Sequence, residues 1–595
     1  MMKLEDILDD AARYLRREMD EEERDFFEEL LNQHPHLWEE LRFMQLVQQG
    51  LTDLQEKQEV KKESNKPPHI FKRKAWGFLI SILIIFILSF GGYKYLLENS
   101  HPDSPIMYCA QNEVSPITIF GGGLGDFGAN RGHSVCAMPS GAIAFVGTFE
   151  GTGILGTCPF ESKGQRDMLI GLYDIENKHF SWLMPIGGKY PDVPMDIVTD
   201  SKGNLIITGS FGGKINFGGR YFRAMGVDDY GERDFFVAKY HPDGQLDWVD
   251  HGGGLWHNPN HTGVNSGYAL VTDSEDNLIV SGVYIGEPII AGERLKSGGP
   301  NEDIFLVKYD NSGNPKWVET ITSNYMVYGY SLGTDDFGNI YIGGSFGHHN
   351  FGGWASFSND TTLYSMGGRD IFLAKYSSEG DFLWVQHAGS KQNKNGYDGV
   401  YGLAVDKNGD VVIAGVYYGE ATFETKRLNS FGGRDIFLAK YSPDGTLKWL
   451  EGMGSAEGSG PKSEQANDIA IDSDGAIYVT GNFTETIYFS DRDSLTTSGN
   501  YNFFLAKYSP EGKVSWIVPV ETKNDFQKAE GRSIAIARNG NIVVTGSLSG
   551  TIRIDNQEIK SQGNGGIFML VFNKDGNLLS TQPIIALVDK VNYLH

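Results

Sequence analysis

A repeating segment of about 66 residues fills most of this 595-residue chain and restricts the folds open to it. GGRDIFLAKYSSEGDFLW (367–384) and GGRDIFLAKYSPDGTLKW (432–449) are near copies, and weaker copies stand before and after them. The aromatic residues that end the inner motif recur at intervals of 64 to 69 residues, at Tyr173, Tyr240, Tyr309, Tyr376, Tyr441, Tyr508 and Phe572. A chain of this length exceeds one ordinary core unless its core is built from such units.

Each repeat contains four short runs with the composition of β-strands. In one repeat they read GLAVD, DVVIAGVY, DIFLAKY and LKWLEG, and Asp/Asn-Gly turns join the first run to the second and the third to the fourth. The second run of each repeat also carries a glycine, at Gly147, Gly209, Gly282, Gly344, Gly415, Gly481 and Gly546. The sequence therefore predicts an all-β fold, a seven-bladed β-propeller of four-stranded blades over 116–588, followed by a tail at 589–595.

The repeats resemble the bacterial β-propeller repeat family of the SBBP type, whose hallmark is D-x-x-G-N-x-Y-V-T-G after a tryptophan. The resemblance covers nearly all of 116–588 and implies the fold and an export compartment, but no activity. The fourth-run motif, which ends in tryptophan, has two imperfect extra copies, PITIFGGG (116–123) and LLSTQPI (578–584). We expect one of them to complete a blade across the chain ends.

Charged residues that recur at the same place in several blades are expected to belong to the scaffold. The repeated lysines should lay their stems on apolar neighbours and keep their ammonium groups in water: Lys239, Lys308, Lys375, Lys440 and Lys507. The aspartates that precede the third run should fix a turn or an interblade hydrogen bond: Asp234, Asp303, Asp370 and Asp435.

Function is expected where the repeat varies. The first-to-second and third-to-fourth turns are short and share one face, whereas the other connections are long, irregular and share the opposite face, which is our predicted working face. Its candidate ligand-binding residues lie in two loops: Trp256, His257, His261, His348 and His349. We expect them to contact an envelope protein, a peptide or a glycan, and we predict no metal and no cofactor because no set of ligands with metal-site spacing accompanies them.

Composition and motifs exclude several classes of function. A formal charge of −25 argues against nucleic acid as a partner. The glycine-rich and acidic turns lack the context of a phosphate loop or an EF-hand, and no nucleophile–base spacing is present, so we predict no catalytic residues and no enzyme. The three cysteines cannot pair completely; Cys136 is expected to act as a small hydrophobe, and a Cys109–Cys158 bridge would need an oxidising compartment.

An uncharged stretch of nineteen residues, AWGFLISILIIFILSFGGY (75–93), predicts a transmembrane helix over 75–95. The preceding linker, 57–74, carries seven basic and two acidic residues, so the positive-inside rule places the N-terminus in the cytoplasm. A second linker, 96–115, leads to the propeller. The chain is thus expected to span a bacterial inner membrane once, with its propeller periplasmic or otherwise extracytoplasmic.

Residues 1–56 have the periodicity of a small cytoplasmic helical domain. YLRREMDEEERDFFEELLNQHPHLWEEL (14–41) resembles the helical N-terminal domain of membrane-anchored anti-sigma factors in its zinc-free form. The resemblance implies binding of a sigma factor, with Phe26, Phe27, Leu30 and Trp38 as partner-binding candidates. The alternative is a helical anchor or dimerisation piece without a regulatory role.

Three hypotheses follow from these features. The first is a single-pass membrane protein that displays a binding propeller outside the cytoplasmic membrane and acts as an anti-sigma-like transmembrane regulator. The second is an anchored envelope interaction scaffold without a signalling role. The third is an envelope enzyme that acts on polysaccharide or peptide at the variable face.

Overall fold

The structure is a computed structural model, and every regular element among the residues it describes is a β-strand. It describes residues 106–108, 130–155, 158–225, 233–254, 264–348, 350–391, 397–455, 464–490, 492–497, 501–522, 528–561, 565–583 and 586–587. The predicted helical domain (1–56), basic linker (57–74) and membrane span (75–95) lie outside these residues. None of the described residues belongs to a helix long and apolar enough to cross a membrane.

The repeat folds into a four-stranded antiparallel unit in which successive strands are neighbours. In one unit, β14 (Ser266–Thr272) pairs with β15 (Leu278–Tyr284), β15 with β18 (Asp303–Tyr309), and β18 with β19 (Pro315–Ser323). We call these the first to fourth strands and name each unit by its first strand. The four runs predicted from the sequence are therefore confirmed as strands.

The same pairing recurs along the chain. The other first strands are β2 (Arg131–Ala137), β8 (Val193–Thr199), β20 (Val327–Thr334), β26 (Gly399–Val405), β30 (Gln465–Ile471) and β37 (Lys528–Ile536). Their second strands are β3 (Ile143–Phe149), β9 (Leu205–Gly212), β21 (Ile340–Phe346), β27 (Val411–Phe423), β31 (Ile477–Phe483) and β38 (Ile542–Ser549). The third strands are β6 (Asp167–Asp174), β12 (Arg233–Tyr240), β24 (Asp370–Tyr376), β28 (Lys426–Tyr441), β34 (Asn502–Tyr508) and β41 (Gly566–Phe572). The fourth strands are β7 (His179–Ile186), β13 (Leu246–Gly252), β25 (Phe382–Ser390), β29 (Leu447–Met453), β35 (Val514–Ile517) and β42 (Leu578–Pro583).

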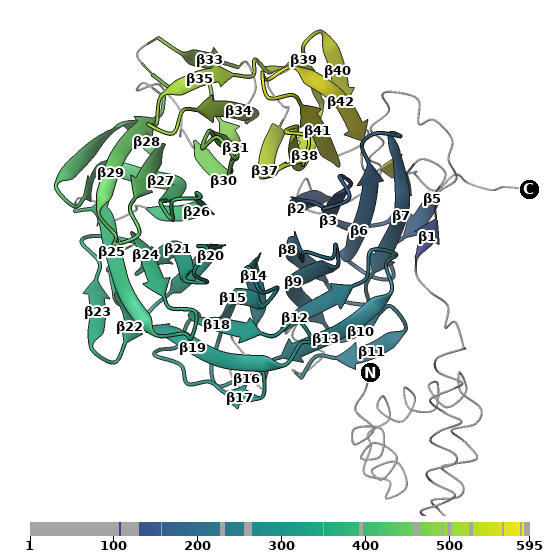
Figure 1. Cartoon of the computed structure of the whole chain (residues 1–595), viewed down its shortest axis with the longest axis horizontal. Helices are drawn as coiled ribbons and strands as arrows, with labels where there is room; N and C mark the ends of the chain where they lie inside the picture. Colours follow the sequence, from purple (N-terminus) through teal and green to yellow (C-terminus); the bar gives the residue numbers. More distant parts are fainter. Residues whose placement is uncertain are drawn as a thin grey trace, which may run out of the picture. The chain divides into compact units, whose positions relative to one another are not determined.

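The units stand around a common axis with their first strands innermost (Figure 1). Each first strand contacts the first strand of the next unit, and β37 contacts β2, which closes the ring. At this junction the Val135 amide donates a hydrogen bond of 3.3 Å to the Ser533 hydroxyl. The all-β propeller predicted from the repeat is therefore confirmed.

The second and third strands are apolar on both faces because each unit packs between two others. Every residue of β15 and β18 is buried, which is the pattern of strands covered on both sides. Adjacent units also share one core: Phe145 of the β2 unit packs with Val543 and Ile567 of the β37 unit. Burial of these faces on neighbouring units makes the ring one hydrophobic structure.

Each tryptophan at the end of the fourth-strand motif bonds to the following unit. The indole nitrogen of Trp248, for example, donates to the Asn311 carbonyl at 3.3 Å, and a Cβ at Gly313 would lie 2.6 Å from the same ring. Gly313 also has a positive φ (84°), a backbone conformation that favours glycine. Glycine is therefore required here both by the turn itself and by the packing of the neighbouring unit's tryptophan. The other bonds run from Trp182 to Pro242, Trp317 to Ser378, Trp384 to Pro443, Trp449 to Pro510 and Trp516 to Lys574.

The prediction that the repeated lysines hold their ammonium groups in water is wrong for four of them. Lys239 and Lys308 are each 3 % exposed, and each pairs with an aspartate of its own first-to-second turn. The buried pairs are Lys239–Asp200 (2.8 Å), Lys308–Asp273 (3.0 Å), Lys375–Asp335 (3.3 Å) and Lys440–Asp406 (2.8 Å). The apolar stems are covered as expected, but the turn supplies a buried partner that the strand pattern does not reveal. Lys507 differs, because its ammonium lies 5.0 Å from the centre of the Tyr478 ring.

The aspartates before the third strand fix turns, as predicted. Asp303 accepts hydrogen bonds of 2.7 Å from the amides of Gly298 and Ser323. Asp234 and Asp370 accept from the Met225 and Met366 amides at 2.8 and 2.6 Å, and Asp435 accepts from the Phe431 amide.

The connections between second and third strands carry hairpins that the sequence analysis treated as irregular loops. Separate hairpins are β4 (Thr152–Leu155) with β5 (Cys158–Glu161), β10 (Lys214–Phe217) with β11 (Arg220–Arg223), β16 (Ile289–Ile290) with β17 (Glu293–Arg294), β22 (Trp354–Ser358) with β23 (Thr361–Tyr364), β32 (Thr486–Tyr488) with β33 (Ser494–Thr496), and β39 (Thr551–Ile554) with β40 (Gln557–Lys560). In the β26 unit, β27 and β28 themselves extend into the hairpin. A further strand, β36 (Glu521–Thr522), pairs with β39. Their short length and mixed polarity conceal these strands in the sequence.

The first and last described strands both pair with strands of the β2 unit. β1 (Met107–Tyr108) pairs with β7 at the outer edge, and β43 (Ala586–Leu587) pairs with β4. The LLSTQPI motif supplies β42, which completes its own β37 unit rather than one across the chain ends, and PITIFGGG (116–123) lies outside the described residues. Cys136 is a free, partly buried thiol packed against apolar residues, as expected, whereas Cys109 lies outside the description.

Candidate functional site

The topology gives the ring two unlike faces. The short-turn face carries the first-to-second and third-to-fourth turns, and the long-loop face carries the other connections. Both faces approach the axis at the ends of the first strands, which lie innermost (Figure 1). These two axial ends are the places to look for a site shared by several units.

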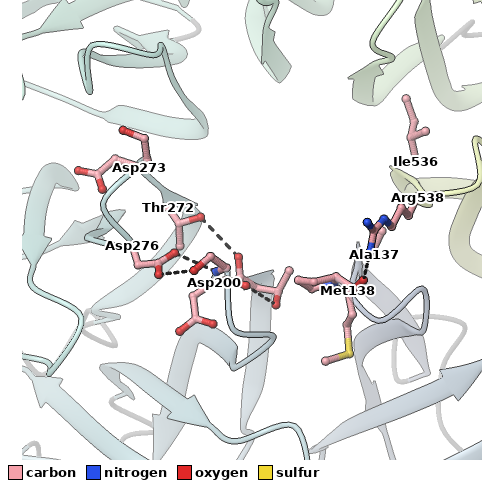
Figure 2. A pocket seen from close by; sticks show the side chains of 12 residues that line it. Ala137, Met138, Asp200, Thr272, Asp273, Asp276, Ile536 and Arg538 are labelled. Carbon is pink, nitrogen blue, oxygen red and sulfur yellow. Dashed lines mark hydrogen bonds between the residues drawn. The ribbon is translucent and has the colours of Figure 1, made fainter.

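A cavity of about 450 Å³ opens at the axis on the short-turn face (Figure 2). It is lined by the first-to-second turns of four units: Ala137, Met138, Pro139, Thr199, Asp200, Ser201, Thr272, Asp273, Ser274, Asp276, Ile536 and Arg538. This is the face opposite to the predicted working face.

The polar groups around this cavity bind one another. Asp276 accepts hydrogen bonds from the amide and the hydroxyl of Ser201, at 2.8 and 2.6 Å. Arg538 donates to the Pro139 carbonyl at 3.2 Å (Figure 2). Asp200 pairs with Lys239, and although burial raises its pKa, the hydrogen bonds from Lys239 and Asn204 outweigh burial and hold the pKa below its usual value. At this end, Asp276 and Arg538 therefore tie neighbouring units together, whereas the Lys239–Asp200 pair lies within one unit.

The long-loop end has a different construction, based on one β-bulge in each first strand. At every bulge, one residue of the first strand is left out of the pairing with the second strand. These residues are all half-buried: His133, Met195, Tyr268, Tyr330, Tyr401, Asn467 and Arg532. We call these the bulge residues. A bulge bends the strand and re-aims a side chain, and bulges are frequent beside functional sites.

The repeated glycine of the second strand makes room for this bulge. Gly344 pairs with Gly329, the residue before the bulge residue Tyr330. A Cβ at Gly344 would lie 1.8 Å from the carbonyl oxygen of Tyr328, which no side chain can occupy. The glycines of the other second strands pair in the same way, so a fixed glycine accompanies a variable bulge residue.

Four tyrosines from three adjacent units form a continuous aromatic wall. Tyr328 and Tyr330 stack with their ring centres 5.4 Å apart, and Tyr330 stacks on Tyr401 of the next unit at 5.0 Å. Tyr268 of the preceding unit lies 5.9 Å from Tyr330 and 6.2 Å from Tyr328. Burial raises the pKa of Tyr268 to about 12, so the phenol stays protonated and can donate a hydrogen bond.

Arginines before the third strands border this wall. The carbonyls of Arg166, Arg233 and Arg369 accept the amides of Asp192, Asn265 and Asp398, which lead into the next first strand. This backbone link holds the arginines beside the innermost strands. Arg369 is 3 % exposed, and its guanidinium lies 5.0 Å from the Tyr328 ring centre and 4.2 Å from that of Tyr397.

Further basic residues lie across the axis from the tyrosine wall, in the β2 and β37 units. Burial and then the charges of Arg532, Arg131 and Arg166 lower the pKa of His133 well below its ordinary value, so this imidazole is neutral at pH 7. Arg532 is paired with Glu530 at 3.1 Å. The Nε atoms of Arg131, Arg166 and Arg369 are buried and have no hydrogen-bond partner in the described part of the chain. We call the whole group the arginine–tyrosine cluster: Arg131, Arg166, Arg369, Arg532, Tyr268, Tyr328, Tyr330 and Tyr401.

The candidate residues predicted from the sequence have a mixed outcome. Trp256, His257, His261 and His349 lie outside the described residues, as do Phe26, Phe27, Leu30 and Trp38. His348 lies in the connection before β22, where it stacks on Phe351 at 4.9 Å and accepts the Asn350 amide at 3.1 Å. No group of His, Cys, Asp and Glu side chains suited to a metal ion occurs in the described ranges.

Sequence reasoning missed the arginine–tyrosine cluster, although the chain carried a signal for it. Aligned on the turn aspartate, the first runs SGYALVTD, YGYSLGTD and VYGLAVD bring Tyr268, Tyr330 and Tyr401 into register. That position changes to histidine, methionine, asparagine or arginine in the other units. Arg369 and Arg434 stand inside the repeated GGRD, where recurring charged residues were expected to belong to the scaffold.

Comparisons with known proteins agree with a repeat protein. No family model matches the chain. The uncharacterised WD repeat-containing protein L264 of Acanthamoeba polyphaga mimivirus is 22 % identical over 455 residues, 63 % of this chain and 31 % of that protein. The regulatory protein FlaEY of Caulobacter vibrioides is 27 % identical over 186 residues, 30 % of this chain and 18 % of that protein. The matches thus span less than a third of either relative.

Solved structures of low sequence identity are also similar. The periplasmic gluconolactonase PpgL of Pseudomonas aeruginosa has a TM-score of 0.36 and 10 % identity, covering 77 % of this chain and 98 % of that one. The α-L-arabinanase of Penicillium chrysogenum complexed with arabinobiose has a TM-score of 0.34 and 12 % identity, covering 63 % and 94 %. Such values carry no argument about activity, and the class of protein, a β-propeller, rests on the strand pairing described above.

Proposed function

We propose that this chain is a membrane-anchored binding protein whose ligand site is the axial end of the long-loop face. The observation that carries the proposal is the set of bulge residues, which differ in chemistry from unit to unit while the surrounding ladder stays the same. Residues that maintain the scaffold recur, whereas residues that contact one off-centre ligand differ among units.

The units are, in this proposal, the seven blades of one propeller. The four-strand pairing that recurs from β2 to β42 and the contact between β37 and β2 support that number. A propeller of repeated blades places loops from many blades around one axis, so a single ligand can contact several of them.

The proposed cellular setting rests on the sequence. The uncharged segment within 75–95 and the basic linker 57–74 support one span of a bacterial inner membrane, with the N-terminus in the cytoplasm and the propeller in the envelope. The ligand is then an envelope protein, peptide or glycan. Residues 1–56 either bind a sigma factor, as an anti-sigma-like regulator would, or only anchor an interaction scaffold.

A thermal-shift measurement tests the binding site without knowledge of the ligand. Envelope extract should raise the melting temperature of the full-length chain and leave the variant Tyr330→Ala/Arg532→Ala unshifted. Phe337→Ser is the matched control, because Phe337 is 86 % exposed in a short turn at the opposite face and its replacement should preserve the shift. An equal shift in all three proteins, or in none, would contradict the proposed site.

The cytoplasmic role needs its own experiment. The tagged full-length chain is purified from its native cell, and bound proteins are identified by mass spectrometry. Recovery of a sigma factor that is lost on Phe27→Ala supports the regulator. If no sigma factor is recovered while the protein remains in the membrane fraction, the scaffold hypothesis replaces it.

The enzyme alternative makes a separate demand. Replacing one bulge residue would have to abolish turnover of an envelope polysaccharide or peptide while its binding persists. If the replacement abolishes binding as well as any turnover, the result favours the binding protein proposed here.

A further inference from the structure

The arginine–tyrosine cluster has a local charge opposite to that of the whole chain. The chain carries a formal charge of −25, yet arginines border the axis at this end: Arg131, Arg166 and Arg532 lie near His133, and Arg369 lies beside Tyr328. The buried Nε atoms of Arg131, Arg166 and Arg369 have no hydrogen-bond partner within the described residues. Burying a cationic donor without a partner is costly, and an anionic ligand would remove that cost.

Apart from the pair of Glu530 with Arg532, the described carboxylates near this cluster form no ion pair with its arginines. Glu530 pairs with Arg532 at 3.1 and 3.3 Å. Asp192 accepts the amides of Gly188 and Gly212, at 2.7 and 3.1 Å. Glu302 lies beside Tyr268 and Tyr328 and raises the pKa of both phenols, after the larger effect of burial, rather than pairing with an arginine. Arg131, Arg166 and Arg369 therefore remain able to bind an anionic ligand.

Arg369 shows how the anion would be held. Its guanidinium lies over the rings of Tyr328 and Tyr397, donates one hydrogen bond of 3.1 Å to Met326 Sδ, and is not bound to a carboxylate among the described residues. A guanidinium fixed by aromatic rings presents a planar pair of donors, which suits the two oxygens of a carboxylate or the oxygens of a sulfate.

The tyrosine wall extends the site beyond one anionic group. From Tyr268 to Tyr401 it crosses three units, and it offers phenolic donors together with ring surface. Met195 is the sole aliphatic side chain among the bulge residues, and the remaining ones are aromatic or hydrogen-bonding. This combination suits a hydroxyl-rich ligand with carbon–hydrogen faces better than the apolar side chains of a peptide.

We propose that the arginine–tyrosine cluster binds an anionic oligosaccharide, with an acidic group on Arg369, Arg131 or Arg166 and sugar rings along the tyrosine wall. The inference rests on the proposed function and assigns its ligand class. It concerns the long-loop end alone, since the charges at the short-turn end are already paired.

Calorimetric titration of the full-length chain tests this assignment. The probes are an oligogalacturonate, a sulfated oligosaccharide, fully methyl-esterified oligogalacturonate and oligoglutamate of matching length. The uronate or the sulfated sugar should bind, more weakly at high sodium chloride, and the neutral ester should bind at least about tenfold more weakly. Which acidic sugar binds more tightly identifies the source of the anion.

Two variants and a control locate the site. Arg369→Lys keeps the charge but loses the planar fork, and should weaken acidic sugar binding about tenfold. Arg532→Gln should weaken it as well, which provides a second variant if the first does not fold. Arg427→Met removes an exposed arginine that pairs with Glu420 on the β27–β28 hairpin, and should change nothing.

Several outcomes would overturn the inference. If the neutral ester binds as tightly as the acidic sugars, the site does not recognise negative charge. If oligoglutamate binds more tightly than the acidic sugars, the site is assigned to acidic peptides. If envelope extract shifts the melting temperature while neither acidic sugar binds, the ligand class is wrong and the proposed function stands. If the extract also fails, both are wrong.

Discussion

The two axial ends of the ring both bury cationic side chains, but these cations differ in how they are paired. At the short-turn end, Lys239 and Lys308 are buried against Asp200 and Asp273, and these pairs hold the turns in place. At the long-loop end, Arg131 and Arg369 each keep a buried Nε atom that has no hydrogen-bond partner among the residues the structure describes. A repeat can thus fix one end of its scaffold with paired charges and leave the other end able to bind a ligand.

The largest effect is expected where a buried pair is broken. Lys308→Met leaves Asp273 buried without its counterion, and should lower the free energy of unfolding by about 4 kcal/mol, read from the urea midpoint. Arg294→Met is the matched control, because its pair with Glu287 is exposed and should contribute less than about 1 kcal/mol. Equal losses in the two variants would remove the distinction between buried and exposed pairs.

A smaller loss is expected from filling the space that each bulge needs. Gly344→Ala places a Cβ against the Tyr328 carbonyl, and should destabilise the chain by about 3 kcal/mol while displacing Tyr330. Gly292→Ala serves as a control without a steric contact, although its positive φ (81°) gives a strain of about 1 kcal/mol. Unfolding in urea measures both, and an unperturbed Gly344→Ala protein would refute the steric account of the bulge.

The interunit tie at Asp468 should add a pH dependence. Its carboxylate accepts the Ile534 amide of the next unit at 2.9 Å, and burial raises its pKa to about 7. The folded chain keeps a proton there that the unfolded chain loses near pH 4, so this group makes stability fall as pH rises from about 4 to about 7. Between pH 5 and pH 8 wild type should lose about 2 kcal/mol relative to Asp468→Asn. Parallel stability profiles of the two proteins would mean that Asp468 does not titrate in this range.

The smallest effect on stability is expected at the long-loop end. Tyr330→Phe removes one hydroxyl from a half-buried ring and should change the free energy of unfolding by less than about 1 kcal/mol. The same variant should bind the acidic oligosaccharide more weakly, because a donor is lost from the wall. A stability loss without a change in affinity would make Tyr330 part of the scaffold.

The sequence was sufficient to predict the propeller because every unit repeats the same strands and turns. Gly282, Trp248 and Asp303 were recognised by recurrence, and each has a packing or hydrogen-bonding role in the structure. The expectation for Lys308 failed because the pairing of a third-strand lysine with a first-to-second turn depends on the sheet. The count of seven blades stays a proposal supported by the strand pairing.

The site was harder to predict, since no local motif marks it. Tyr268, Tyr330 and Tyr401 look like ordinary strand residues until the bulge separates them from the ladder. Arg369 was hidden by its place in a repeated motif. Loop histidines such as His257 attracted attention because they are unusual, and the structure does not describe most of them.

The tryptophan bonds also make the joints of the ring unequal. Each runs forward, from a fourth strand to the next unit, from Trp182 to Trp516. In the β37 unit, Ser580 occupies the tryptophan position, as shown by its pairing with Val571. The joint to the β2 unit therefore rests on the shared core of Phe145 with Ile567, on the Ser533 and Arg538 hydrogen bonds and on β43. That joint is a seam. When the ring unfolds under heat or mechanical load, we expect the β37 and β2 units to separate first. The remaining units should then separate one after another, each step breaking one tryptophan hydrogen bond.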